Sequence, residues 1–341
     1  MRFKLLALLL ALFAVLSMPN ARAATTVSNF VGARTGAIGT LTIGTPVTGP
    51  KVAASGWVSY NGRWVQMSRG TAIFDVTFND GGRTRRFAVV RREPANSAVP
   101  AVIMLHGAGS NPEDQVTLSN VSAGVAASGY WALLPQGVDG GWNQDPGVST
   151  GIDDVGFVAK LIDIATGYFK LDGARVYASG MSEGGFMTAR LGCELSDRIA
   201  GTALVAATMS RNLSLACAPA APRPMLMFSG TSDTLVPYNG GRLGVLSAPD
   251  TFSFWLTRHN CTTTATVTST LADSVSDGTT VKLQRNAGCG SGREVRLYTI
   301  NNGGHTWPGG YQYLPEATIG KTTKDLNATT ELYKVLSGYK L

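Results

Sequence analysis

Short apolar runs separated by longer amphipathic stretches restrict how this chain can fold more than any other feature. Nearly continuous runs of five or six residues are typical of strands buried on both faces. They are Ala101–Leu105, Tyr130–Leu134, Arg175–Ser179, Thr202–Ala207, Met225–Ser229 and Val295–Ile300. Between them, "DDVGFVAKLIDIATGYF" carries one apolar helical face formed by Val158, Leu161, Ile162, Ala165 and Tyr168. This alternation predicts an α/β fold with a mainly parallel sheet and helices on both faces.

The first 23 residues have the pattern of a secretory signal peptide. Two basic residues precede an apolar run over 5–18, and "ARA" at 21–23 fits a cleavage site. The run covers 14 residues, whereas a membrane-spanning helix needs about 20, so we expect no stable membrane anchor. Cleavage after Ala23 would leave 318 residues, enough for one large domain, secreted to the periplasm or the extracellular space.

Residues 24–70 are expected to form an N-terminal β-rich arm, and residues 71–341 the main α/β domain. The arm is dominated by Gly, Thr, Ser and Val and lacks helical periodicity. Within it, "GWVSYNGRWVQM" predicts a β-hairpin, because Asn61-Gly62 suits a type I′ turn. The hairpin either packs on the main domain or binds a surface through Trp57, Tyr60 and Trp64.

The charge pattern argues against a nucleic-acid partner. The formal net charge is +7, and it falls to +4 without the three basic residues of the first 23. The one dense basic stretch, "RTRRFAVVRR" at 83–92, is interpreted as a strand with charged flanks that discourage edge pairing. A nucleic-acid site would need more basic residues with interleaved aromatics. The sequence does not indicate an oligomeric state.

Four cysteines in a chain bound for an oxidising compartment predict two disulfides. Three pairings are possible, and we favour Cys193–Cys217 with Cys261–Cys289 because sequential pairs close short loops. In the loop-entropy model, each bridge would contribute about 3 kcal/mol. A metal site is not expected, since no C-x-x-C spacing occurs and the chain holds only three histidines.

A glycine-rich turn predicts that Ser182 is a nucleophile. The frame Gly180-Met181-Ser182-Glu183-Gly184 matches G-x-S-x-G, with a strand-like segment before it and a helix-capable stretch after it. Small neighbours permit the sharp turn that exposes the serine, and the start of the helix favours developing negative charge. A purely structural turn is the alternative.

A serine nucleophile needs a base, and the base must be one of three histidines. His106, in "MLHGAG", precedes the serine, whereas enzymes with this serine turn place the histidine last. His259, in "WLTRHNC", ends a probable helix, where a structural histidine is ordinary. His305, in "NNGGHTWPGG", follows the last predicted strand in a loop able to project its ring over the sheet edge. We therefore assign His305 as the base.

The acid that orients the base and the donors that hold an oxyanion can also be assigned. Asp233, in "MLMFSGTSDTLVPY", follows a core strand between the serine and the histidine, where it would fix the histidine tautomer. Glu183 N–H, next to the nucleophile, is the first expected oxyanion donor. The second comes from the "HGAG" loop, where Ala108 is preferred over Gly107.

Taken together, five motifs resemble those of secreted esterases grouped as polyhydroxybutyrate depolymerases and feruloyl esterases of carbohydrate esterase family one. The motifs are "MLHGAGSN", "GIDDVGFVAKLID", "RVYASGMSEGGFM", "FSGTSDTLVPY" and "GGHTWPGG". The similarity extends from about Arg83 to the C-terminus. It implies an α/β-hydrolase fold, a Ser182, Asp233 and His305 triad, and no metal or organic cofactor.

The sequence therefore predicts a secreted serine carboxylic ester hydrolase that works through an acyl-enzyme. The first expected substrate is a polyhydroxyalkanoate-type aliphatic polyester or oligoester. The alternative is release of feruloyl or acetyl groups from plant polysaccharide, and a serine peptidase on the same scaffold is a third reading. Residues near the motifs are expected to contact the substrate, namely His106, Gly107, Trp142, Tyr238 and Trp307.

Overall fold

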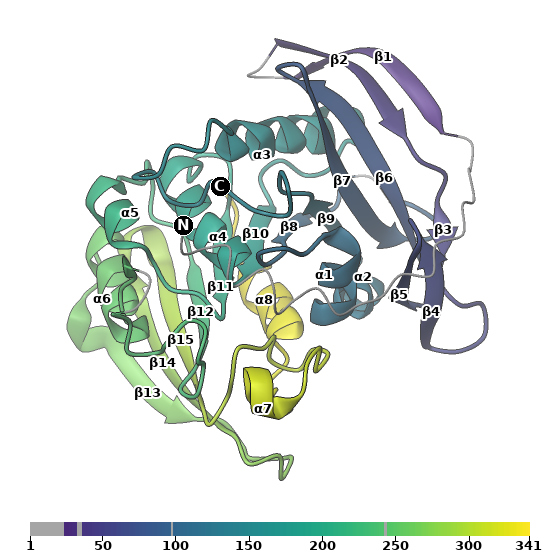
Figure 1. Cartoon of the computed structure of the whole chain (residues 1–341). Coiled ribbons are helices and arrows are strands. Elements are labelled where there is room, and N and C mark those ends of the chain that lie inside the picture. Colours follow the sequence, from purple (N-terminus) through teal and green to yellow (C-terminus); the bar gives the residue numbers. More distant parts are fainter. Residues whose placement is uncertain (1–23, 33–35, 97, 242–243) are drawn as a thin grey trace.

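The computed structural model describes residues 24–32, 36–96, 98–241 and 244–341 (Figure 1). The predicted signal peptide, residues 1–23, lies outside the described residues. No helix in the described ranges combines the length and the apolar character needed to cross a membrane.

Six parallel strands form the centre of the fold, and each contains most or all of one of the apolar runs. They are β8 (Ala101–Leu105), β9 (Trp131–Pro135), β10 (Val176–Met181), β11 (Gly201–Val205), β12 (Met225–Gly230) and β15 (Arg293–Asn301). Their spatial order is β9-β8-β10-β11-β12-β15, and every neighbouring pair runs parallel. All six therefore end at the same edge of the sheet, where side chains from different loops can meet.

Antiparallel strands extend this centre on both sides. They are β1 (Thr25–Gly32), β2 (Gly36–Ile43), β3 (Val47–Thr48), β6 (Thr71–Asp80), β7 (Arg83–Arg92), β13 (Thr266–Thr270) and β14 (Thr280–Cys289). One side adds β7, β6, β2 and β1 in that order, with β3 also on β6, and the other adds β14 and β13. Within the described residues, thirteen strands thus share one sheet.

Helices cover both faces of the sheet (Figure 1). One face carries α1 (Pro112–Ser119), α2 (Val121–Ser128) and α8 (Ala328–Leu336), and the other carries α3 (Asp154–Asp163), α4 (Glu183–Glu194) and α6 (Ala248–Arg258). Because strand side chains alternate, Met104 packs in the first layer while Ile103 and Leu105 pack in the second. Shorter helical segments are Ile164–Tyr168, α5 (Arg211–Ala216), Thr263–Ala265, Gly290–Gly292 and α7 (Glu316–Ile319).

The N-terminal segment is continuous with the main sheet, because β2 and β3 both pair with β6. Its hairpin, β4 (Ser55–Tyr60) with β5 (Arg63–Ser68), forms a separate two-stranded sheet. Asn61 and Gly62 have φ values of 49° and 72° in the turn, the positive φ values that a type I′ turn requires.

The interpretation of residues 83–92 as a strand with charged edge flanks is partly wrong. The strand exists as β7, but it lies inside the sheet between β6 and β9. Arg85 is only 4% exposed and pairs with buried Asp154 at 2.7 Å, with its guanidinium over the Phe157 ring. A buried pair of this kind links β7 to the start of α3 and does not protect an edge.

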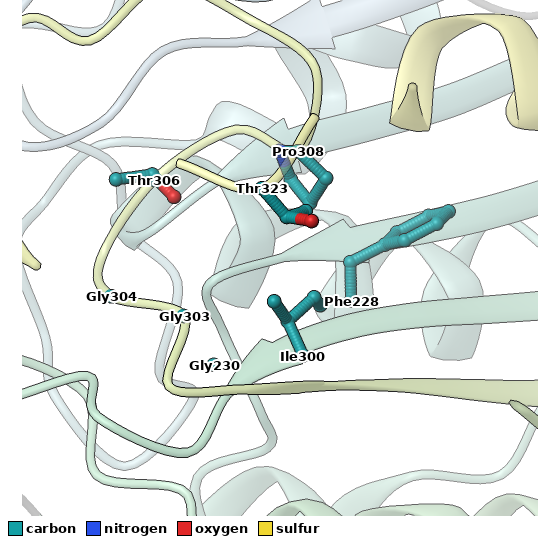
Figure 2. Close-up of a pocket in the computed structure, with 8 residues that line it drawn as sticks. All are labelled: Phe228, Gly230, Ile300, Gly303, Gly304, Thr306, Pro308 and Thr323. Atoms are coloured by element: carbon teal, nitrogen blue, oxygen red, sulfur yellow. The ribbon is translucent and has the colours of Figure 1, made fainter. Parts of the chain in front are cut away.

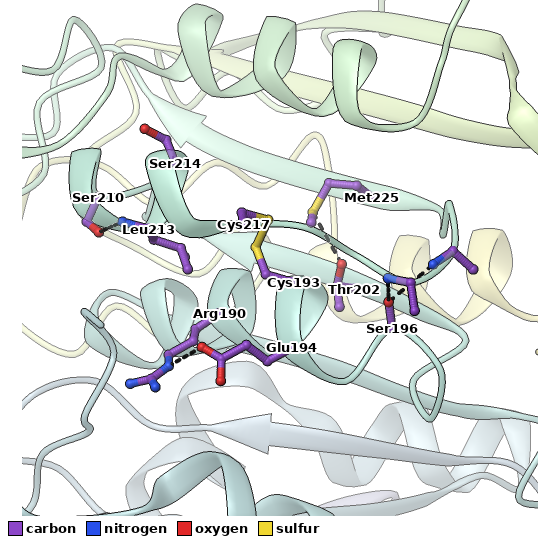
Figure 3. Close-up of a disulfide and its surroundings, with 12 residues drawn as sticks. Arg190, Cys193, Glu194, Ser196, Thr202, Ser210, Leu213, Ser214, Cys217 and Met225 are labelled. Atoms are coloured by element: carbon purple, nitrogen blue, oxygen red, sulfur yellow. Dashed lines mark hydrogen bonds and ion pairs between the residues drawn. A yellow bond between two sulfur atoms is a disulfide. The ribbon is translucent and has the colours of Figure 1, made fainter. Parts of the chain in front are cut away.

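Both disulfides have the predicted pairing, which is thereby confirmed. Cys193 joins Cys217, and this bridge ties the end of α4 to the segment after α5 (Figure 3). Cys261 joins Cys289, which ties the segment after α6 to the end of β14. Each bridge closes a separation of fewer than 30 residues, at 24 and 28.

Candidate active site

Ser182 occupies the sharp turn between β10 and α4. Its φ and ψ are 56° and −124°, a conformation that a non-glycine residue rarely adopts. The turn is fixed on both sides, because Ser182 N–H donates to Val205 O at 2.9 Å and Ser182 O accepts from Gly185 and Phe186. The strained residue is thus held by its neighbours at the carboxyl edge of the sheet.

Glycines around Ser182 are required by close backbone contacts. A Cβ at Gly180 would lie 2.3 Å from Gly184 O, and a Cβ at Gly184 would lie 2.4 Å from Leu105 O. Both distances are far shorter than a real carbon contact, so a side chain at either position would displace main chain. The G-x-S-x-G pattern therefore reflects the packing of β10, α4 and the end of β8.

Asp233 and His305 meet at the same edge, from the loops after β12 and β15. His305 Nδ1 donates to Asp233 Oδ2 at 2.7 Å. Asp233 Oδ1 accepts from the N–H groups of Leu235 and Val236 at 2.9 and 2.8 Å, which fixes the carboxylate. Both side chains are less than 5% exposed. An Nδ1–H held in this way leaves Nε2 available as a proton acceptor.

The loop that carries His305 is anchored by its backbone. His305 N–H donates to Ile319 O at 2.6 Å, and the Tyr313 hydroxyl donates to His305 O at 3.0 Å. Behind it, Phe228, Ile300 and Pro308 line a cavity of about 10 Å³ (Figure 2). A space of this size holds at most one water molecule, so it does not accommodate an acyl group.

The structure brings Asp233 and His305 together but does not join Ser182 to them by a hydrogen bond. Among the described residues, Ser182 Oγ has no hydrogen-bond partner, and the nearest groups from another loop include Gly107. A Cβ at Gly107 would lie 3.5 Å from Ser182 Cβ, so the "HGAG" loop lies directly beside the serine. Catalytic hydrogen bonds of this type often tighten only when substrate binds.

Backbone donors are available next to Ser182. Glu183 is the first residue of α4, where an N–H has no partner within the helix. In the described chain, Ala108 N–H also donates to no protein acceptor, whereas its neighbours Gly109 and Ser110 donate to Gly140 O and Gly107 O. These two free N–H groups belong to the residues predicted as oxyanion donors.

His106 is a structural residue in this loop, and its expected contact with substrate is wrong. Its side chain is fully buried, and Nε2 accepts from Gly137 N–H at 3.0 Å, so Nδ1 carries the proton and donates to Gly107 O at 2.8 Å. The Trp142 indole lies against the His106 ring, with centroids 4.9 Å apart and the planes tilted by 41°, and it donates to His106 O. Burial lowers the pKa of His106 to about 4, so the ring is neutral and braces the loop.

The Glu183 side chain, next to Ser182, has a carboxyl oxygen buried from solvent. Burial raises its pKa to about 7, against the effect of a backbone hydrogen bond from Trp142, and nearby Asp154 acts in the same direction as burial. Its Oε2 has no hydrogen-bond partner among the described residues. Because the pKa is raised, less negative charge lies beside Ser182 near neutral pH than an ordinary glutamate would place there.

Of the three aromatic residues expected to contact substrate, two are core residues. Trp307 is fully buried and donates through Nε1 to Thr329 Oγ1 at 3.0 Å, so its expected substrate contact is wrong. Trp142 is 5% exposed and supports His106, as described above, and its contact with substrate stays a prediction. Tyr238 is half-buried after Asp233, with its hydroxyl 3.0 Å from Thr299 Oγ1, and stays a candidate.

Sequence reasoning missed the loop that follows β9. Gln136 and Gly137 hold the His106 ring, and Gly140 O accepts from Gly109 N–H at 2.8 Å. A Cβ at Gly140 would lie 3.2 Å from Gly109 Cα, which explains the glycine. The dense glycines of "QGVDGGW" were the available signal, since they indicate close backbone packing.

A second hollow lies away from these residues. A depression of about 380 Å³ borders the Cys193–Cys217 disulfide, with Glu194, Ser196 and Leu213 among its walls (Figure 3). Cys193 lies eleven residues after Ser182. At a rise of about 1.5 Å per residue, the depression is roughly 16 Å along α4 from the serine. It is therefore not an acyl pocket.

Comparison with known proteins identifies the relatives of the chain. No protein-family model matches it. It is 30% identical over 280 residues to NocK, a candidate esterase of Nocardia uniformis subsp. tsuyamanensis, and the match covers 75% of this chain and 80% of NocK. It is also 30% identical over 224 residues to feruloyl esterase B of Piromyces equi, covering 62% of this chain and 40% of that protein.

A solved structure supports the fold independently. The crystal structure of a thermostable esterase matches with a TM-score of 0.51 at 14% identity, covering 93% of this chain and 76% of that one. The expected α/β-hydrolase fold is therefore confirmed. The similarity to NocK extends over most of both chains and agrees with the resemblance indicated by the motifs. The chain belongs to the α/β-hydrolase esterase family that includes NocK.

Proposed function

We propose that the protein is a secreted serine esterase that releases feruloyl groups from plant polysaccharide, with acetyl groups as a second acyl class. Ser182 is the nucleophile, His305 the base and Asp233 the orienting acid. The observation that carries the proposal is the 2.7 Å hydrogen bond from His305 Nδ1 to the fixed, buried Asp233 carboxylate. This pair stands at the sheet edge that also carries the strained Ser182 turn.

Acylation follows from this arrangement. His305 Nε2 takes the proton of Ser182 Oγ as the oxygen attacks the ester carbonyl carbon. Asp233 stabilises the imidazolium that forms. The carbonyl oxygen becomes an oxyanion that accepts hydrogen bonds from Glu183 N–H and Ala108 N–H, and each such donor is worth on the order of 10²–10³ in rate. When the intermediate collapses, the bond between the carbonyl carbon and the sugar oxygen breaks. His305 gives its proton to that oxygen, which leaves as the sugar hydroxyl.

Deacylation repeats the same steps with water. His305 Nε2 removes a proton from a water molecule, whose oxygen attacks the acyl carbon. The second tetrahedral intermediate uses the same two N–H donors. Its collapse releases the carboxylic acid and returns the proton to Ser182 Oγ, so that the enzyme is regenerated.

The preference for polysaccharide esters comes from the relatives. Feruloyl esterase B is named for feruloyl ester cleavage, and it shares 30% identity with this chain. The aliphatic polyester expected first from the sequence has no counterpart in the names of the relatives described above. Two disulfides and the signal pattern of the first 23 residues support secretion.

A substrate panel tests the proposal. The purified protein is assayed with methyl ferulate, acetylated xylan, poly-3-hydroxybutyrate film and an aryl ester paired with its matching amide. We expect the highest kcat/KM on methyl ferulate among the natural-type esters and no amide turnover. Rapid erosion of the film with weak methyl ferulate turnover would favour the polyester reading. Amide turnover would favour the peptidase reading.

A further inference from the structure

The strongly exposed aromatic side chains of the described residues gather at one place. Those more than a third exposed are Trp57 at 50%, Trp64 at 69% and Tyr311 at 44%. The rings of Trp57 and Tyr311 are in contact, with centroids 6.2 Å apart and an edge-on geometry of 82°. Clustered exposed apolar residues indicate a binding surface more often than single ones do.

The hairpin register puts both tryptophans on one face. Trp57 pairs with Gln66, and Ser59 pairs with Trp64, so Trp57 and Trp64 are diagonal neighbours on the same side. Such neighbours are separated by about 7–8 Å. The opposite face carries Val65, which is fully buried. The hairpin therefore already packs one apolar face on the body of the protein and presents a second aromatic face to solvent.

This aromatic face, defined here as the platform of Trp57, Trp64 and Tyr311, is linked to the loop of His305. Tyr311 follows His305 by six residues, and its N–H donates to Leu118 O in α1 at 3.0 Å. Gly310 lies between His305 and Tyr311 in the chain. It approaches Leu118 O so closely that a Cβ on Gly310 would be 2.2 Å from that oxygen. The His305 loop and the platform thus share one support, α1.

The platform is rigid, because the hairpin is fixed to the body by polar contacts. Asn61 Nδ2 donates to Asp75 Oδ2 at 2.7 Å and to Glu113 Oε1 at 2.9 Å. Gln66 N–H donates to Thr117 Oγ1 at 3.1 Å. Arg86 pairs with the buried Glu113 carboxylate beneath the turn. A rigid surface loses little conformational entropy when a ligand binds.

The chemistry of the platform fits a neutral sugar chain. The other side chains on the tryptophan face are Ser55, Ser59, Gln66 and the buried Ser68, which are uncharged hydrogen-bonding groups. Aromatic rings pack on the apolar C–H faces of pyranose rings, while hydroxyl and amide groups bond to sugar hydroxyls. A lipid surface or a nucleic acid would instead favour basic residues among the aromatics, and the tryptophan face carries none.

We propose that Trp57, Trp64 and Tyr311 form a subsite that binds the neutral polysaccharide backbone bearing the ester cleaved at Ser182. This inference deepens the proposed function and rests on it. The aromatic rings stack on backbone sugars and hold the polymer beside the catalytic loop, so the subsite acts on polymeric substrate and is not reached by a small ester.

Binding is tested separately from turnover. Each platform substitution is made in a Ser182→Ala background, and retention on insoluble neutral arabinoxylan is measured by depletion. The W57A/W64A protein should bind about tenfold more weakly than its parent, Y311A should lose several-fold, and W57F/W64F should recover most of the binding. Leu215→Ala, which removes an 85% exposed apolar side chain on α5, is the matched control and should bind normally. Unchanged binding by W57A/W64A overturns the proposal.

Turnover in the active enzyme gives the second readout. For W57A/W64A, the ratio of kcat/KM on feruloylated arabinoxylan to that on methyl ferulate should fall about tenfold, with an unchanged circular dichroism spectrum. An unchanged ratio overturns the proposal, as does tighter binding to anionic vesicles or to poly-3-hydroxybutyrate film than to arabinoxylan. If the wild-type enzyme hydrolyses neither feruloyl ester, the proposed function is wrong. The binding assay in the Ser182→Ala background then still tests whether the platform binds the polysaccharide.

Discussion

Asp233 is the residue whose surroundings best define the proposed chemistry. Its two carboxylate oxygens have separate partners, since Oδ1 accepts hydrogen bonds from two backbone N–H groups and Oδ2 accepts one from His305 Nδ1–H. The carboxylate is therefore oriented before substrate arrives. A preoriented acid fixes which nitrogen of His305 is protonated and so leaves Nε2 to act as the base.

Asp233→Asn should lower kcat by about 10⁴-fold while leaving substrate binding largely intact. The amide keeps the size of the side chain, but its NH₂ group can donate to the histidine and favour the wrong tautomer. Steady-state kinetics on methyl ferulate, together with binding of ferulate to the variant, checks this. A variant with more than a tenth of wild-type kcat would show that Asp233 does not orient the base.

His259 serves as a control for His305. His305→Ala should reduce kcat/KM by on the order of 10⁴-fold, because the proton acceptor is lost. His259 is buried at the end of α6 beside Trp255, and His259→Ala should change kcat/KM by less than about threefold. Both are measured on the same ester, with folding followed by circular dichroism. Similar losses in the two folded variants would contradict the assignment.

Among the elements, α4 joins the Ser182 turn to a disulfide. It begins directly after Ser182 and carries Cys193 near its end, where the bridge to Cys217 holds the segment after α5. Breaking this bridge therefore releases packing at the far end of the helix, whereas the strained turn at its start keeps its own hydrogen bonds.

Replacing Cys193 and Cys217 by serine should lower the free energy of unfolding by about 3 kcal/mol, because the unfolded chain gains the entropy of an open loop. The same change at Cys261 and Cys289 should have a similar effect, since the two loops have similar lengths. Urea denaturation of the three proteins measures both effects. Losses below about 1 kcal/mol in both variants would show that the bridges are not stabilising.

The way in which an element is buried decides whether it could be predicted from the sequence. The six parallel strands were predictable because burial on both faces leaves a continuous apolar run. The position of β7 inside the sheet was not, since Arg85 is neutralised by Asp154, a residue 69 positions away. From the sequence alone, the charge of Arg85 looked like that of an exposed residue flanking an edge strand.

The residues of the candidate site also divide into those whose positions could be predicted from the sequence and those whose positions could not. Ser182, Asp233 and His305 each follow a recognisable strand, so their positions at the sheet edge could be expected. The burial of His106 and Trp307 could not, because it depends on Gly137 and Thr329, which lie 31 and 22 residues away. A binding surface of Trp57, Tyr60 and Trp64 was one of two alternatives for the hairpin, and the sequence did not show that Tyr60 is buried at 6% exposure or that Tyr311 lies beside Trp57.

For the whole molecule, two buried neutral histidines set a limit on acid stability. Burial lowers the pKa of His106 and of His259 to about 4, below the value near 6.5 of an unfolded chain. Between these values the unfolded state binds more protons than the folded state, so stability decreases as pH falls. The contribution is fully present above about pH 6.5 and is lost towards pH 4.

The free energy of unfolding should therefore decrease between pH 6.5 and pH 4, with each histidine contributing up to about 3 kcal/mol. His259→Phe tests this, because the ring still packs on Trp255 but cannot take up a proton. Urea denaturation at several pH values should give a shallower pH dependence for the variant. An identical slope in both proteins would mean that His259 does not titrate on unfolding.

Covalent trapping tests the central claim, that Ser182 attacks the ester carbon. Diethyl 4-nitrophenyl phosphate reacts with an activated serine, whose Oγ bonds to phosphorus as 4-nitrophenolate leaves. Intact-mass and peptide analysis should find one diethyl phosphoryl group per chain, located on Ser182, with ester hydrolysis lost in proportion to labelling. The Ser182→Ala protein should stay unlabelled and inactive. Labelling at another residue, or full ester turnover by a protein labelled at Ser182, would contradict the account.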